Sequence, residues 1–596
     1  MRGSSQAKPP NDLAITLALA AIGAALAFAG VLWSAAWLAA LMTGQAPPTS
    51  GLSGSLGVLA DPTHPGEVFG VQHLHPVPYW TVTGACFAVI TAAGVMLWRL
   101  LAGWRQTAAD DPNRIPGVAS GPEIARAASA RVLLGKAATL RPSLAGRASL
   151  RPADVGYLLG MGKGGEIWAT VEDSFLICGA PRSGKGLMLV INAILDAPGA
   201  VVATSTRPDN ATITMTARAR QGPIAIFDPQ GLAPGLDAGM RWSPVRGCQN
   251  PLTAMIRAKG LSSSAGFEGV SEASFWEGKT TGAIQCLLHA AALDGKDART
   301  VYQWALSPTA AADAVRILAS HSDAAEGWAE TLESMVQADP RTRDSIWQGV
   351  SLSFSALADP RVLDAVLPRP GEEFDPERFL LERGTLYLLA TGAGAGASAG
   401  LVAAMVEDLV ETAKGIAARS PGARMDPPLL LCLDEVANIA PLPSLPSLMS
   451  EGGGSGITCM PVLQSLAQAR DRWGENLANA IWDSAIVKIL LGGASNSRDL
   501  QDLCTLIGER DEETDSVTVD AYGSHSSQRS IRRVPILPPD AIRSLPFGTG
   551  VVLLRTAKPI IAKLRPWIQR QDAAELKTAR AAIEEKLRLT HLEGRS

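Results

Sequence analysis

One segment of the sequence combines a glycine-rich turn and a lysine between an apolar strand and an apolar helix, SFLICGAPRSGKGLMLVINAIL at residues 174–195. The glycines allow the backbone to wrap closely and point N–H groups at phosphate oxygens, and the following helix N-terminus adds partial positive charge. Lys185 can neutralise the β- and γ-phosphates of a nucleotide. We therefore expect ATP on a turn made of Gly179, Ala180, Pro181, Arg182, Ser183, Gly184, Lys185 and Gly186.

A second segment places two acidic residues at the end of an apolar strand, in PPLLLCLDEVANIA at residues 427–440. We expect Asp434 to hold hydrated Mg²⁺ and Glu435 to polarise the attacking water. Gly186 stands where a Ser or Thr usually ligates the metal, so Mg²⁺ depends on water, the phosphates and Asp434. The plainer alternative is an ordinary strand end carrying two solvated acids.

The strand ITCMPVL is followed by Gln464 and Ser465. A polar side chain at this place can lie beside the nucleotide and sense the γ-phosphate, so Gln464 is a candidate catalytic residue. Ser465 can instead serve as the N-cap of the helix that follows it.

These residues need a sheet that brings several strand ends together. Short apolar strands alternate with amphipathic helices from about residue 154, and near-continuous apolar runs are typical of strands buried on both faces of a parallel sheet. The strand signal disappears between Asp228 and Thr385, where helices are expected instead. The sequence predicts an α/β fold interrupted by an all-helical block, with strands at 166–171, 174–178, 200–204, 224–228, 385–390, 429–435, 457–463, 485–491 and 550–555.

The N-terminal part of the sequence is apolar. The chain has 596 residues, 47% of them hydrophobic and 18% charged, with net charge −4, which excludes a globally basic coat for nucleic acid but not a basic channel. Runs at about 13–41 and 77–101 are long enough to cross a bilayer, and the first is too long for a cleaved signal peptide. The connecting segment 43–76 has no Lys or Arg, whereas basic residues flank both runs, at Arg2, Lys8, Arg99, Arg105 and Arg114. We expect a multi-pass protein of the cytoplasmic (plasma) membrane with both termini cytoplasmic.

Together GAPRSGKG, LDEVANIAPLPSLPSLMSEGGGSGI and VLQSLAQARDRWGE resemble the TraG/TraD-type coupling proteins of type IV secretion and bacterial conjugation, in an actinobacterial style. The resemblance covers roughly residues 150–565. It implies a RecA-like P-loop NTPase with two N-terminal transmembrane helices and an inserted all-α domain. The expected parts are a membrane anchor (1–110), a linker (111–153), a nucleotide-binding domain in two pieces (154–246 and 384–568), the insert (247–383) and a C-terminal helix (569–596).

The resemblance also implies the activity. Such a protein is a membrane-anchored ATPase that assembles as a hexamer on nucleotide or DNA, recruits relaxase-bound single-stranded DNA or relaxosome proteins to the type IV secretion channel, and drives translocation. Carried over, Lys185 contacts phosphates, Asp434 and Glu435 serve Mg²⁺ and water, and Gln464 couples hydrolysis to movement. The family's arginine that acts in trans has no counterpart in EGGGSGI, so Arg470 and Arg472 are candidates.

Other functions remain open at this point. They are an FtsK-like double-stranded DNA translocase, a protein-secretion ATPase of the same superfamily, and a membrane scaffold that does not hydrolyse nucleotide. The presence of Lys185, Asp434 and Glu435 argues against the scaffold. The seven cysteines show no CxxC pair or zinc spacing, so we expect small core residues.

Overall fold

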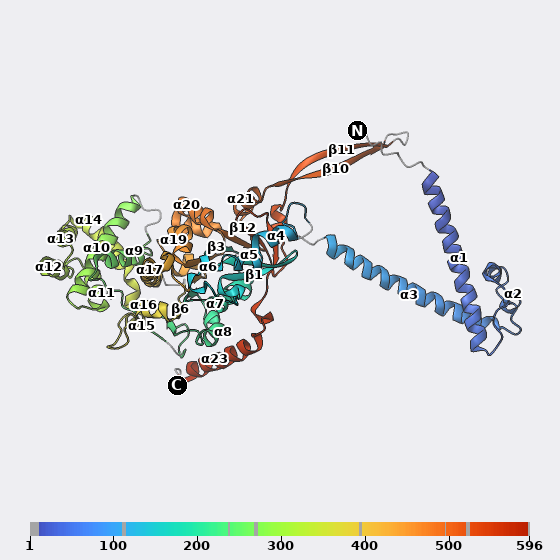
Figure 1. Cartoon of the computed structure of the whole chain (residues 1–596), viewed down its shortest axis with the longest axis horizontal. Coiled ribbons are helices and arrows are strands. Elements are labelled where there is room, and N and C mark those ends of the chain that lie inside the picture. Colours follow the sequence, from blue (N-terminus) through green and yellow to red (C-terminus); the bar gives the residue numbers. More distant parts are fainter. Residues whose placement is uncertain are drawn as a thin grey trace. The chain divides into compact units, whose positions relative to one another are not determined.

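The structure of the chain is a computed structural model that describes residues 11–109, 115–236, 239–266, 272–391, 396–494, 496–519 and 525–593. It divides into two compact units, residues 1–111 and 112–596 (Figure 1).

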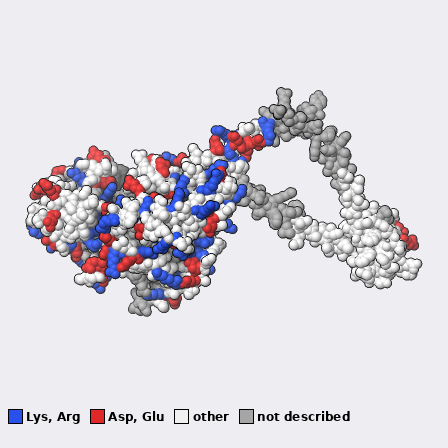
Figure 2. All heavy atoms as spheres, in the orientation of Figure 1, with Lys and Arg blue, Asp and Glu red and all other residues white. Residues whose placement is uncertain are grey.

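The first unit is built on two long helices, α1 (Asn11–Met42) and α3 (Pro76–Ala109), joined through η1 (Leu52–Leu59) and α2 (Pro65–Phe69). The segments Ile22–Met42 and Pro76–Leu97 are long and apolar enough to cross a membrane. Figure 2 shows that the described part of this unit carries few charged side chains. The expected apolar helices are therefore present. Arg2, Lys8 and Arg114, on which the orientation depends, lie outside the described residues.

The second unit is organised by an eleven-stranded sheet with the order β2-β1-β13-β12-β9-β3-β8-β7-β4-β6-β5. From β9 to β5 all neighbouring strands are parallel, and β12, β13, β1 and β2 extend the sheet in antiparallel fashion. The mostly parallel α/β sheet is thus confirmed. The strands are β1 (Gly156–Gly162), β2 (Gly165–Thr170), β3 (Phe175–Cys178), β4 (Val201–Ser205), β5 (Ile224–Phe227), β6 (Thr385–Leu389), β7 (Leu429–Leu433), β8 (Ile457–Leu463), β9 (Val487–Leu491), β12 (Thr549–Leu554) and β13 (Ile560–Lys563).

Helices cover both faces of the sheet, which explains why its central strands are apolar throughout. One core contains side chains of η5 (Gly186–Val190), α7 (Ile191–Asp196) and α8 (Asp209–Arg218). The other contains α17 (Gly396–Ala418), α18 (Val436–Ile439), α19 (Leu445–Glu451) and α20 (Leu466–Ser484). Alternate residues of one strand serve the two cores. In β3, for example, Ile177 belongs to the first core and Leu176 to the second.

The expected all-helical block lies between β5 and β6. Its buried residues join the core on the α17 side of the sheet, and Figure 1 shows α10 to α14 gathered at the end of this unit away from β1 and β12. The helices are α9 (Pro251–Ser262), α10 (Ala273–Leu293), α11 (Ala298–Leu306), α12 (Ala312–Ser320), α13 (Trp328–Val336), α14 (Pro340–Ser353), α15 (Pro360–Ala365) and α16 (Pro376–Leu381).

Several elements differ from the sequence expectation. Strands β1 and β13 were not predicted, and β2 pairs antiparallel rather than joining the parallel set. Within the segment expected as a linker, α4 (Gly121–Ala128), α5 (Ala130–Leu134) and α6 (Ala137–Leu140) pack into the core of the second unit, because each supplies at least one buried apolar side chain. A separate two-stranded ribbon, β10 (Glu509–Val519) with β11 (His525–Pro535), was also not predicted.

The C-terminal helix α23 (Ala573–Glu593) packs against α8 in the second unit. Among the described residues, the cysteines agree with the expectation that they are small core residues. Six of the seven thiols are buried and none forms a disulfide.

Candidate functional site

The glycine-rich turn follows β3 and leads into a helix that begins with the π-helical turn η5 and continues as α7. Gly184 has φ of +91°, and Arg182 has φ of +63°, a left-handed conformation that side chains rarely adopt. A Cβ on Gly179 would stand 2.6 Å from the hydroxyl oxygen of Ser183 and 3.1 Å from Leu491, so a larger residue there would force these side chains to move. The turn is therefore folded tightly on itself, as a phosphate cradle requires.

Lys185 points back into this turn. Its ammonium group donates a hydrogen bond to the carbonyl oxygen of Gly179, 2.7 Å away. Burial lowers the pKa of Lys185, while the charges of Asp434 and Glu435 act in the opposite direction and favour its protonated form. The three predicted charged residues therefore belong to one electrostatic site.

The sheet explains why these residues meet. Strand β8 lies between β3 and β7, and all three run parallel, so their carboxyl ends share one edge of the sheet. Asp434 and Glu435 directly follow β7, and Thr204 at the end of β4 donates a hydrogen bond to the main-chain carbonyl of Asp434 at 2.7 Å. Glu435 has φ of +50°, a strained conformation of the kind that concentrates at functional sites.

Asp434 is an acid in an unfavourable environment. Burial raises the pKa of Asp434 to about 6; the negative charges of Glu435 and Asp209 add to this rise, and the nearby Lys185 opposes it. Its Oδ1 atom is buried and has no hydrogen-bond partner among the described residues. A buried carboxylate oxygen without a partner, close to a phosphate cradle, is a ligand of the type that Mg²⁺ takes, directly or through water. The residues present therefore fit a nucleotide-bound Mg²⁺.

Gln464 follows β8, the strand between the lysine and the acids. It lines a cavity of about 350 Å³ together with Gly179, Ala180 and Pro181 of the turn, which places it next to the phosphate cradle. Ser465 accepts a hydrogen bond from the N–H of Gln468 at 3.3 Å and is the N-cap of α20, as expected.

The two candidate arginines for a trans-acting role both lie on α20 and make contacts within their own chain. Arg470 is largely buried and forms an ion pair with Asp499 of α21 (Ser497–Ile507). Arg472 donates a hydrogen bond to the main-chain carbonyl of Ser263 at 2.9 Å. The structure of one chain does not bring either arginine into contact with Lys185 or Asp434 through a described hydrogen bond or ion pair.

Three contributors to the site were missed by sequence reasoning. Thr204 fixes the backbone of Asp434, Asp209 raises its pKa, and Asp499 positions the beginning of α20 through the N–H of Leu466 at 2.9 Å. A signal existed for the first two, because they flank the end of a predicted strand in VVATSTRPDN. No sequence spacing predicts that Asp499 lies near Gln464, because its hydrogen bond with the N–H of Leu466 depends on how α21 packs.

In this parallel sheet, a glycine-rich loop follows β3 and an acidic pair follows β7, with β8 between them. This arrangement defines a RecA-like P-loop NTPase. Solved structures of the conjugative coupling protein TrwB share this fold. An unbound form has 18% identity and a TM-score of 0.52, covering 72% of this chain and 90% of that one. A complex with a non-hydrolysable ATP analogue has 18% identity and a TM-score of 0.53, covering 76% and 93%. A complex with ADP and Mg²⁺ has 17% identity and a TM-score of 0.52, covering 75% and 93%.

The sequence itself carries a family segment. Residues 428–547 match the family model described as "TraM recognition site of TraD and TraG". This stretch runs from the strand of Asp434 to the loop before β12. No curated protein sequence matches the chain. With this segment and a fold shared with TrwB, the chain is similar to proteins of the TraG/TraD type.

Proposed function

We propose that this protein is a membrane-anchored ATPase that couples relaxase-bound single-stranded DNA to a type IV secretion or conjugation channel and drives its transfer. The observation that carries the proposal is the pairing of Lys185 with Asp434 and Glu435 at the carboxyl edge of one parallel sheet. A fold kept only for assembly has no need to bury an acid at the cost of a raised pKa beside a lysine.

The residues divide the work of hydrolysis. Lys185 leaves the carbonyl of Gly179 and neutralises the β- and γ-phosphates. Glu435 accepts the proton of the water that attacks the γ-phosphorus, and the bond to the bridging oxygen of ADP breaks. Mg²⁺, held through Asp434 and its water, neutralises phosphate charge when it is bound. Gln464 lies at the edge of the cradle, where it distinguishes the triphosphate from the diphosphate.

Assembly supplies the remaining charge. A homo-hexamer brings an arginine of one subunit to the γ-phosphate held by its neighbour, and Arg470 and Arg472 are the two candidates. Arg470 is 13% exposed and paired with a carboxylate, so its release would leave Asp499 without its cation.

The first unit provides the anchor. Its two apolar helices span the cytoplasmic membrane with both termini and the motor on the cytoplasmic side, because the connecting segment 43–76 has no basic residue. The family segment at 428–547, whose model is described as a TraM recognition site of TraD and TraG, is the region that would recognise relaxosome proteins here.

The test uses the full chain in detergent or nanodiscs. We expect ATP hydrolysis that single-stranded DNA stimulates, a loss of at least about 100-fold in Lys185→Ala and Glu435→Gln, and failure of plasmid transfer in cells that carry either variant. Stimulation by double-stranded DNA alone would favour an FtsK-like translocase. No hydrolysis by the assembled wild-type protein, with or without DNA, would leave a scaffold as the explanation, and normal transfer by Lys185→Ala would overturn the proposal.

A further inference from the structure

Phe547 is an aromatic side chain at the phosphate loop that the catalytic residues do not use. It is 66% exposed, and its ring atoms Cε2 and Cζ lie 3.0 and 3.1 Å from the position that a Cβ on Gly184 would occupy. The ring therefore contacts the loop one residue before Lys185. Isolated exposed apolar side chains are common on proteins, so the location of this one, not its exposure, is the informative feature.

The sheet places Phe547 on the side of the loop opposite the acids. Strand β12 is antiparallel to β9, with Gly550 opposite Leu491, and β9 is parallel to β3, with Leu490 opposite Cys178. The turn before β12 therefore lies at the same sheet edge as the phosphate loop. Asp434 and Glu435 lie two strands away in the other direction, beyond β8. A nucleotide with its γ-phosphate toward the acids would extend its base toward β12.

The turn that carries Phe547 is held in place by main-chain hydrogen bonds. The N–H of Thr549 donates to the carbonyl of Pro546 at 2.9 Å, and the N–H of Leu564 donates to the carbonyl of Gly548 at 2.8 Å. Met188, in the first turn of the helix after the loop, has its Cε 3.5 Å from the Cβ position of Gly548. Ring and thioether thus form a fixed apolar surface beside the helix N-terminus, where the α-phosphate and its ribose belong.

We propose that Phe547 is the stacking platform for the base of the bound nucleotide. This inference rests on the proposed nucleotide site and adds the subsite for its base. An aromatic ring offers a π-face and no hydrogen-bond donor or acceptor, so it binds adenine and guanine about equally and the smaller pyrimidines less well. The site therefore selects a base by its size and not by its hydrogen-bonding groups.

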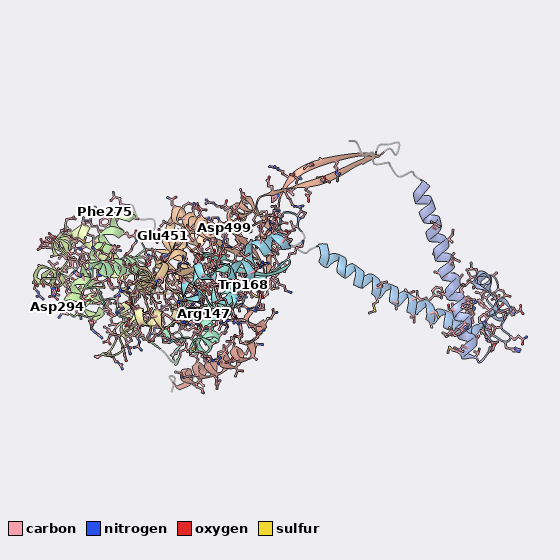
Figure 3. The ribbon with its side chains drawn as sticks, in the orientation of Figure 1. Arg147, Trp168, Phe275, Asp294, Glu451 and Asp499 are labelled. Carbon is pink, nitrogen blue, oxygen red and sulfur yellow. The ribbon has the colours of Figure 1, made fainter. Side chains whose placement is uncertain are left out.

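The experiment measures equilibrium binding of ATP, GTP, CTP and inorganic tripolyphosphate to the full chain in detergent, for the wild type, Phe547→Ala and Phe547→Trp. In Phe547→Ala we expect the Kd for ATP and GTP to rise about tenfold or more and that for tripolyphosphate to stay unchanged. In Phe547→Trp, affinity for ATP is retained. Phe275→Ala is the matched control, because Phe275 is also exposed and lies in the all-helical block (Figure 3).

Each other outcome counts against the proposal. An unchanged Kd for ATP in Phe547→Ala overturns the proposal. This holds even if the variant forms oligomers differently, because Phe547 would then act in assembly and not in binding the base. A rise that is equal for ATP and tripolyphosphate overturns it as well, because the loop itself would then have been damaged. Failure of the nucleotide site as a whole is recognised separately, because the wild type would then bind neither ATP nor tripolyphosphate.

Discussion

The guanidinium group of Arg470 forms an ion pair with the carboxylate of Asp499, and the same carboxylate accepts a hydrogen bond from the N–H of Leu466 at 2.9 Å. One acid on α21 therefore fixes the first turns of α20, two residues after Gln464. The position of Gln464, which we propose as the γ-phosphate sensor, depends on this contact between two helices.

Arg470 is expected to act within its own subunit. We expect Arg470→Ala to lower thermal stability and ATPase activity together, because it leaves Asp499 partly buried without a cation. The measurement that separates cis from trans action is subunit mixing. Rings made from Lys185→Ala and Arg472→Ala subunits regain activity if Arg472 acts in trans, whereas Lys185→Ala mixed with Arg470→Ala stays inactive. Recovery in the second mixture would show that Arg470 reaches the neighbouring site.

Gly186 leaves room for the metal ligand that the loop lacks. A Cβ on Gly186 would meet no described atom within 4 Å, and the residue does not have a positive φ. We expect Gly186→Ser to fold and to reduce the Mg²⁺ concentration for half-maximal ATPase activity several-fold, since its hydroxyl can join the coordination shell. Gly186→Ala has the same backbone effect without the oxygen, so equal Mg²⁺ dependence of the two variants would contradict the explanation.

The sequence carried enough information to predict the central strands, the phosphate loop and the acids, because each depends on a local pattern. On the antiparallel side of the sheet, β2 and β12 were predicted as strands, but β1, β13 and the antiparallel direction were not. Strand β1, YLLGMG after Gly156, is rich in glycine, and its pairing with β13 joins residues about 400 positions apart in sequence, as Met161 opposite Lys563 illustrates. The role proposed for Phe547 depends on a different pairing, that of β12 with β9, which places the turn before β12 at the sheet edge of the phosphate loop.

Asp434 is expected to link activity and stability to pH. Because burial raises its pKa from 3.8 to about 6, the folded state binds a proton more readily than the unfolded chain. The free energy of unfolding is therefore highest at low pH, where the acid is protonated, and it falls as the pH rises toward 6. Above that pH the buried acid is ionised, and its burial lowers the free energy of unfolding by the full amount, on the order of 2–3 kcal/mol. ATPase activity should rise through pH 6, since the ionised form is needed for Mg²⁺.

The check is Asp434→Asn, with Tm measured in the absence of nucleotide and ATPase activity measured separately. We expect it to abolish ATPase activity and to raise Tm at pH 7.5 by more than at pH 5, because only the ionised acid is penalised by burial. Thr204→Val, which removes the hydrogen bond to the carbonyl of Asp434 and keeps the charge, serves as the comparison. An equal change in Tm at both pH values for Asp434→Asn would show that the acid is not destabilising in its ionised form.

The all-helical block is joined to helix α17 of the sheet domain by a buried ion pair. Arg257 of α9 and Asp408 of α17 are 2.8 Å apart, with 1% and 10% of their side chains exposed. Trp242 donates a hydrogen bond to Asp408 at 3.3 Å, and the guanidinium lies 5.2 Å from the centre of its ring. Removing one charge leaves the other buried without a partner, which costs about 3–5 kcal/mol.

We expect Arg257→Met to lower Tm by several degrees and to expose the insert to limited proteolysis. Arg257→Met with Asp408→Leu should recover much of the loss, and Arg378→Met, which breaks the exposed pair with Glu382, should change Tm little. If the double variant were no more stable than Arg257→Met, the loss would come from packing of the arginine stem and not from the unpaired acid.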